Sequence, residues 1–291
     1  MAAPSRGSWS ISEPYRGVGR VLFYAWLALV SIWVLFPFFW AIENSLKTTE
    51  QTFTRGAFLP WLQYQPTLGS WQAVLSDPDA IRALLNSVLI SVATTLIVLA
   101  LVTPAAYALA RYEFRPMSSR DVTVWFLTQR ALPPAVVLVP YFVLMVHLRL
   151  IDTRTGLIVV YVAATLPFGV VIMRDIFRDI PLELEEAAFI DGASDLRVFG
   201  RISLPLAVNG LVATAIIVFA FNWNEAILAS TLTSRVAQTL PFFILSSRST
   251  RGVDFNTAAV NSLIAILPPV VLSLIIQRFL ARGLTFGAVK G

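Results

Sequence analysis

The amino-acid sequence predicts an all-α membrane protein with six transmembrane helices, because of its composition and its six long apolar segments. The 291 residues are 57% hydrophobic and only 13% charged, whereas soluble domains carry about 25% charged residues. A bilayer is the environment that fits such a chain. Each apolar segment has close to the roughly 20 residues that a helix needs to cross the hydrocarbon core. The predicted spans are 21–42, 83–110, 122–148, 155–173, 206–230 and 257–277.

The first predicted span, 21–42, follows a tail that carries Arg6, Arg16 and Arg20. It ends in bulky residues where a cleaved signal peptide would need small ones, so we interpret it as a retained span. With the N-terminus inside, the inner segments hold 13 Lys and Arg residues and the outer loops hold 8. This bias predicts that both termini are cytoplasmic.

The loop after the first span contains Trp61, Tyr64 and Trp71. Such residues suit the membrane interface, so we expect this loop to form an extracytoplasmic cap. The other five spans form one predicted core. The expected organisation is a cytoplasmic tail, the first span, the cap, the core and a second cytoplasmic tail, at 1–20, 21–42, 43–82, 83–280 and 281–291.

The composition excludes several functional classes. The chain has no cysteine and one histidine, which removes disulfides, thiol nucleophiles and most zinc sites. No phosphate-binding loop motif occurs, so the chain is not itself an ATPase. The net charge of +5 is scattered between apolar runs, which argues against nucleic-acid binding. We therefore expect a protein without a catalytic site, a metal or a cofactor of its own.

The inner loop 174–205 is longer than a helix–helix connection needs to be. Asp179 and Pro181 predict the start of a short helix, and Gly192 predicts a sharp turn at its end. A second short helical pattern follows, which we expect Pro205 to close. The two helices either lie on the lipid surface or fit a groove in a protein partner, and the acidic character of the first favours the partner.

The same loop carries a spaced motif, which consists of Glu186, Ala187, Ala188, Gly192, Ile202, Leu204 and Pro205. The motif resembles the EAA motif of ABC importer permeases, with three residues before the glycine and nine after it. Further segments, among them Trp223-Asn224-Glu225 and 283–291, resemble the MalG-type carbohydrate branch. The resemblance covers 80–291 most strongly. Ala226 departs from it, since relatives typically have Phe there.

The resemblance implies the type I ABC importer permease fold and import of a carbohydrate or polyol-type solute across the inner membrane of a bacterium. It implies a heterodimer with a second permease, two copies of a cytoplasmic ATPase that binds ATP and Mg, and an extracytoplasmic solute-binding protein. The binding protein would meet the loop 231–256, and the ATPase would meet the tail 284–291. The inner loop would be the coupling helix that docks on the ATPase. We assign this coupling role to Glu185, Glu186, Ala187, Ala188, Asp191, Gly192, Ile202, Leu204 and Pro205.

Polar residues at membrane depth form a second candidate group, because ionisable groups there are costly. Arg130, in the third predicted span, is either a pathway residue or a structural side chain that snorkels or pairs with the second permease. Gln129 binds either a hydroxyl-rich solute or a neighbouring helix. Pro133-Pro134 and Pro140 predict breaks in this span, which are tolerated where a helix lines a cavity.

Four polar or amphipathic residues near the outer end of the fifth span contact either the solute, the binding protein or the lipid headgroups. Asn86, at the start of the second span, either caps its helix or lies in the pathway. The candidate pathway residues are Asn86, Gln129, Arg130, Asn222, Trp223, Asn224 and Glu225. An ion-coupled secondary transporter is the alternative function. It would require carboxylates in mid-span, and only Glu225 lies near a span.

Overall fold

The computed structural model describes residues 18–54, 58–131, 133–246 and 254–287, and this part of the chain consists of helices joined by turns. Five of its helical segments are long and apolar enough to cross a membrane. Four of them lie within or coincide with α1 (Val18–Ser45), α4 (Pro78–Arg111), α7 (Arg154–Arg178) and α13 (Phe255–Gly287). The remaining one, Asp195–Asn224, ends in α10 (Leu204–Asn224).

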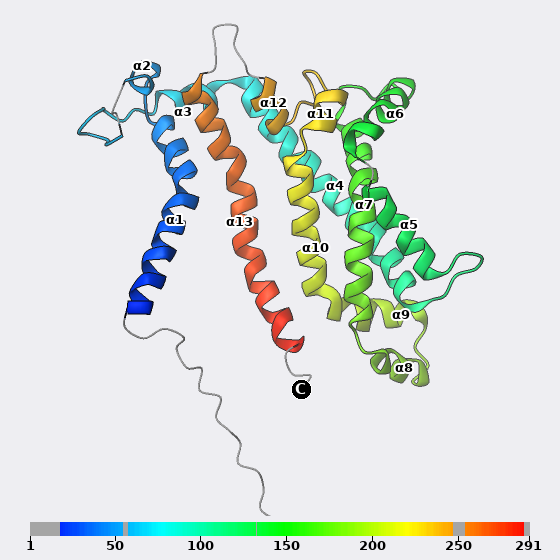
Figure 1. Ribbon diagram of the computed structural model, residues 1–291. Helices are drawn as coiled ribbons and strands as arrows, with labels where there is room; N and C mark the ends of the chain where they lie inside the picture. Colours follow the sequence, from blue (N-terminus) through cyan, green and yellow to red (C-terminus); the bar gives the residue numbers. More distant parts are fainter. Residues whose placement is uncertain (1–17, 55–57, 132, 247–253, 288–291) are drawn as a thin grey trace, which may run out of the picture.

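The predicted third span, 122–148, is not one helix. It divides into α5 (Ser119–Ala131) and α6 (Pro134–His147), with Pro133 at the N-cap of α6. Proline has no N–H for the helical ladder and disfavours the helical conformation in the residue before it, which explains the break. Pro140 lies inside α6 and does not interrupt it. In Figure 1, α5 lies beside the lower part of α7 and α6 beside its upper end, so the two together replace one long helix.

The predicted fifth span, 206–230, ends earlier and begins differently. Helix α10 ends at Asn224, and the separate α11 (Ile227–Leu232) follows. At the other end, α9 (Asp195–Val198) and a π-helical segment (Phe199–Ser203) run directly into α10. The expectation that Pro205 closes the second short helix is therefore wrong. Pro205 lies in the first turn of α10, where a missing N–H is tolerated.

Other boundaries also shift. Helix α4 already begins at Pro78, because Asp77 caps its N-terminus by accepting a hydrogen bond from the N–H of Asp79. The predicted cap therefore shortens and contains two short helices, α2 (Thr49–Thr52) and α3 (Gly69–Ser76). The expected C-terminal tail continues α13 as far as Gly287, and 288–291 lie outside the described residues.

Two groups of short helices mark opposite ends of the molecule (Figure 1). The cap end contains α2, α3 and α12 (Leu240–Ser246), and the hairpin end contains α8 (Leu182–Ile190) and α9. The core between these ends forms where α4 packs along α7 and α10. Small residues allow a close approach: a Cβ at Gly169 would lie 3.1 Å from a methyl carbon of Val102.

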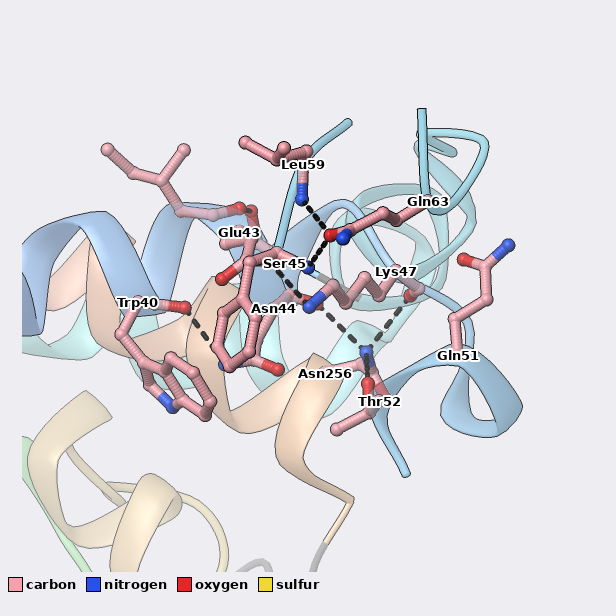
Figure 2. A network of polar contacts seen from close by, with 12 residues as sticks. Trp40, Glu43, Asn44, Ser45, Lys47, Gln51, Thr52, Leu59, Gln63 and Asn256 are labelled. Carbon is pink, nitrogen blue, oxygen red and sulfur yellow. Dashed lines mark hydrogen bonds and ion pairs between the residues drawn. The ribbon is translucent and has the colours of Figure 1, made fainter. Parts of the chain in front are cut away.

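Helix α1 packs against α13 but stands apart from this core (Figure 1). A polar network joins the two helices at the cap end (Figure 2). The Asn256 amide donates to the carbonyl oxygens of Asn44 and Lys47, at 2.8 and 3.0 Å. The ammonium of Lys47 lies 2.7 Å from the Glu43 carboxylate and 4.8 Å from the centre of the Tyr64 ring. The cap end of α1 is thus fixed by buried polar groups.

Candidate functional site

The hairpin between α7 and α10 forms as the sequence predicts. Helix α8 begins after Pro181, and Gly192 follows its end with a φ angle of +81°. The N–H of Gly192 donates to the carbonyl of Phe189, and the N–H of Ala193 donates to that of Ala188. These two bonds form a Schellman cap, which requires a left-handed residue at the position that Gly192 occupies. The turn is therefore encoded in the local sequence.

The outer surface of the hairpin is both apolar and acidic. Ile190 is 87% exposed and Leu196 is 82% exposed. Glu186 and Asp191 are exposed beside them. Exposed Arg197 and Arg201 follow on the second half of the hairpin. An exposed surface of large apolar side chains with charged neighbours is typical of a docking site for another protein.

Glu185, the neighbour of Glu186, points inward and is buried. Its carboxylate accepts hydrogen bonds from Arg111 Nε at 2.9 Å, from the Tyr107 hydroxyl at 3.2 Å and from the Ser203 hydroxyl at 2.8 Å. Burial opposes ionisation of this carboxyl, but the hydrogen bonds from Arg111 and Ser203 outweigh it and hold the pKa below its usual value. Glu185 is therefore ionised at neutral pH.

The other predicted coupling residues divide between the surface and the interior of the hairpin. Exposed positions are Glu186, Ala187, Asp191, Gly192 and Pro205. Partly buried positions are Ala188, Ile202 and Leu204. Arg111, Tyr107 and Ser203 were missed in the sequence analysis. The one available signal was that Arg111 is a charge at the very end of an apolar run, which calls for a partner.

Three predicted pathway residues line one cavity. Gln129, Asn222 and Glu225 come from α5, from α10 and from the turn after α10, and they border a space of about 310 Å³. Rings and hydroxyls complete its wall, from Tyr141, Tyr161, Thr165, Phe168 and Phe221. The Asn222 side chain is almost fully buried, and its amide nitrogen has no hydrogen-bond partner among the described residues. Such a cavity offers hydrogen-bonding groups and apolar ring faces to a small solute.

The remaining predicted pathway residues lie elsewhere. Asn86 is fully buried at the cap end, where its amide donates to the carbonyl oxygens of Val236 and Gln238 and accepts from Arg154. Asn224 is exposed and bonds within its own helix. The side chain of Arg130 lies outside the described residues.

Trp223 is also buried away from the cavity. Its indole N–H donates to the carbonyl of Ala265 at 2.8 Å, which joins α10 to α13. The idea that Trp223 anchors at the headgroups does not fit this position.

Asp152, which precedes α7, organises the loop between α11 and α12. Its carboxylate accepts hydrogen bonds from four consecutive backbone N–H groups, at residues 234–237, and from the Ser234 hydroxyl. Partial burial raises the pKa of this carboxyl, but these donors outweigh that effect and lower the pKa to about 2. The loop beyond the cavity is thus held by one charged side chain.

Comparisons with known proteins agree with this arrangement. Residues 103–286 match the family described as binding-protein-dependent transport system inner membrane component. The trehalose transport system permease protein SugB of Mycobacterium tuberculosis is 34% identical over 94% of this chain and 100% of its own length. The trehalose/maltose transport system permease protein MalG of Thermococcus litoralis is also 34% identical, over 94% of this chain and 97% of its own.

A solved structure shows the same fold. It is the crystal structure of a bacterial ABC transporter involved in the import of the acidic polysaccharide alginate. One of its chains aligns with a TM-score of 0.75 and 21% identity over 91% of this chain and 99% of its own. The protein is a multi-pass membrane protein that belongs to the family of binding-protein-dependent transport system inner membrane components.

Proposed function

We propose that the chain is one permease subunit of an ATP-driven importer for a neutral carbohydrate or polyol-type solute. The observation that carries this proposal is the hairpin around Gly192, which presents an apolar and acidic surface at one end of the membrane helices. Two relatives, similar over nearly their full lengths, are named for trehalose or trehalose/maltose transport, which supports the solute class. ATP hydrolysis would occur on a separate subunit.

The hairpin end would face the cytoplasm and receive the ATPase. Ile190 and Leu196 would enter its groove, and Glu186 would meet basic residues at the rim. A second permease would complete a heterodimer, and two ATPase copies would hold ATP and Mg. Both termini would then be cytoplasmic. At the opposite end, the cap and the loop that Asp152 organises would receive the solute-binding protein.

The cavity would form this subunit's part of the solute pathway. Amide groups of Gln129 and Asn222 can bond to sugar hydroxyls, and the buried amide nitrogen of Asn222 lacks a partner that a solute would supply. The rings of Phe168 and Phe221, whose centres lie 4.8 Å apart, offer apolar faces to a sugar ring. Glu225 adds a carboxylate acceptor.

The test is uptake by the whole complex. The chain is coexpressed with a second permease, an ATPase and a solute-binding protein from the same organism, and the complex is reconstituted in proteoliposomes. We expect ATP-dependent uptake of a labelled neutral disaccharide. Gly192→Pro, which cannot adopt a φ of +81°, and Glu186→Lys should abolish uptake and weaken copurification of the ATPase. Uptake driven by an ion gradient without ATP would contradict the proposal.

A further inference from the structure

In helix α8, the pattern of buried and exposed side chains is the reverse of that in an ordinary surface helix. Such helices bury an apolar stripe and expose their charges. Among the nine residues of α8, all of them described, Glu185 is the one buried side chain. The large apolar residues of α8 are between 41% and 87% exposed, namely Leu182, Leu184, Phe189 and Ile190. The helix is therefore held to the rest of the chain by a carboxylate and not by apolar packing.

The partners of this carboxylate come from two different elements. Arg111 and Tyr107 lie in the last two turns of α4, and Ser203 is the last residue of the π-helical segment before α10. A second arm of Arg111 donates to the carbonyl of Ile180, just before α8, at 3.0 Å. One buried group thus joins the hairpin to the ends of two membrane spans.

A buried ion pair is a costly way to hold a helix, since apolar residues of similar volume often do so equally well. What the ion pair adds is direction, because hydrogen bonds fix angles and distances that apolar contacts leave loose. Ser203 lies in a π-helical segment, a form that occurs mostly as single turns within α-helices and frequently at functional sites. A buried ion pair beside a π-helical turn suits a connection through which the hairpin and the ends of α4 and α10 move together.

We propose that Glu185 is a positioning residue that joins the coupling hairpin to α4 and α10, so that a displacement of the hairpin moves both spans together. The inference rests on the proposed function, and it assigns different roles to two neighbouring glutamates. Glu186, which is exposed, meets the ATPase, and Glu185, which is buried, transmits its movement. Arg111 and Ser203 act with Glu185 as positioning residues.

The test compares uptake per ATP hydrolysed in the reconstituted complex. Glu185→Gln keeps the shape of the side chain and removes its charge. We expect the ATPase to copurify within twofold of the wild-type amount and to keep hydrolysing ATP. Uptake per ATP should fall at least about tenfold, as expected when a charge-assisted hydrogen bond is lost. Arg111→Lys, which keeps the charge, should restore part of the coupling relative to Arg111→Ala.

The matched control is Glu43→Gln, the same change at the buried ion pair of the cap end. Glu43 is 3% exposed, so it contributes nothing to the cap surface that would receive the solute-binding protein, and the change should leave uptake per ATP unchanged. Equal ratios for wild type and Glu185→Gln would overturn the inference, and so would loss of the ATPase from the Glu185→Gln complex, because Glu185 would then act in docking.

A second variant keeps the inference testable if Glu185→Gln does not fold. Ser203→Ala removes one hydrogen bond from a small side chain, and it should lower uptake per ATP severalfold in a complex that melts at the wild-type temperature. An unchanged ratio of uptake to ATP hydrolysis in that folded complex would contradict the proposed role of Glu185. Absence of ATP-dependent uptake in the wild-type complex would instead contradict the proposed function, so the two failures are distinguishable.

Discussion

The hairpin end and the cap end each bury one carboxylate against one cation, but they do so in different ways. At the hairpin end, Glu185 pairs with Arg111 at 2.9 Å, and the side chains are 4% and 6% exposed. At the cap end, Glu43 pairs with Lys47 at 2.7 Å, and the side chains are 2% and 4% exposed. The first pair joins residues 74 positions apart, whereas the second joins residues four apart at the end of α1.

The surroundings of the two pairs also differ. Three aromatic rings, those of Trp40, Phe58 and Tyr64, lie within 6 Å of the Lys47 ammonium and close that site. Around Glu185, the Tyr107 ring packs against Phe177 and Phe199, with ring centres 5.4 and 4.9 Å apart, whereas the large apolar side chains of α8 remain exposed on the hairpin surface. The comparison teaches that a buried ion pair can stabilise a fixed helix end at the cap end and, by our proposal, can connect a moving hairpin to two membrane spans at the other end.

The largest expected effect comes from breaking either pair. Arg111→Ala leaves Glu185 buried without its cation, which should cost about 3–5 kcal/mol of stability. Lys47→Ala should cost a similar amount at the cap end for the same reason. Denaturant or thermal unfolding in detergent measures both. A cost below about 1 kcal/mol for Arg111→Ala would mean that the hairpin pair is solvated, in the manner of a surface ion pair.

Asp152 gives a pH test at the cap end. Its pKa is lowered from 3.8 to about 2 in the folded chain, so its contribution is fully present above about pH 4 and is lost as the pH falls through about 2. Asp152→Asn should cost about 1–2 kcal/mol at neutral pH, a value reduced for partial exposure. The difference between wild type and variant should shrink between pH 4 and pH 2. A difference independent of pH would show that the charge does not matter.

A smaller effect should separate two glycines of the hairpin region. A Cβ at Gly192 or at Gly200 would meet nothing within 4 Å, but only Gly192 has a positive φ, of +81°. Gly192→Ala should therefore cost about 1–2 kcal/mol through left-handed strain, and Gly200→Ala should be neutral or slightly stabilising. Unfolding midpoints of the two variants, measured side by side, check this. Equal costs would place the cause outside the backbone conformation of Gly192.

Replacing both partners of a pair by apolar residues should change stability much less than removing one partner. The double variants Glu43→Leu with Lys47→Met, and Glu185→Leu with Arg111→Met, should each lie within about 2 kcal/mol of wild type. Their function should differ, since the cap variant keeps normal uptake per ATP and the hairpin variant loses it. If both double variants transport normally, the pair of Glu185 and Arg111 stabilises the fold but does not couple the hairpin to the spans.

The sequence predicted much of this fold, because apolar composition locates membrane spans. It predicted the break at Pro133-Pro134, but also one at Pro140, which α6 tolerates, and it did not locate the end of α10 at Asn224, because apolar residues continue beyond that point. Backbone hydrogen bonding, and not composition, decides where those helices stop.

The candidate site was predicted to a similar degree. The turn at Gly192 depends on local residues and was readable. The inward orientation of Glu185 depends on Arg111, 74 residues away, and no local pattern reveals it. Asn86 and Trp223 were assigned to the pathway, but their hydrogen bonds join helices and loops. A polar residue in an apolar run signals a partner without showing whether that partner is protein or solute.

The most direct test of the central claim uses two single cysteines, because the chain has none of its own. Ile190→Cys on the hairpin and Leu62→Cys in the cap replace residues that are 87% and 82% exposed. In the complex with its ATPase, Ile190→Cys should cross-link to the ATPase. In vesicles that contain the permeases without the ATPase, it should react with a membrane-impermeant maleimide only when the vesicles are inside-out. Leu62→Cys should react only from the outside and form no such cross-link. The reverse labelling, or an ATPase cross-link at Leu62→Cys, would contradict the assignment of the hairpin as the coupling surface.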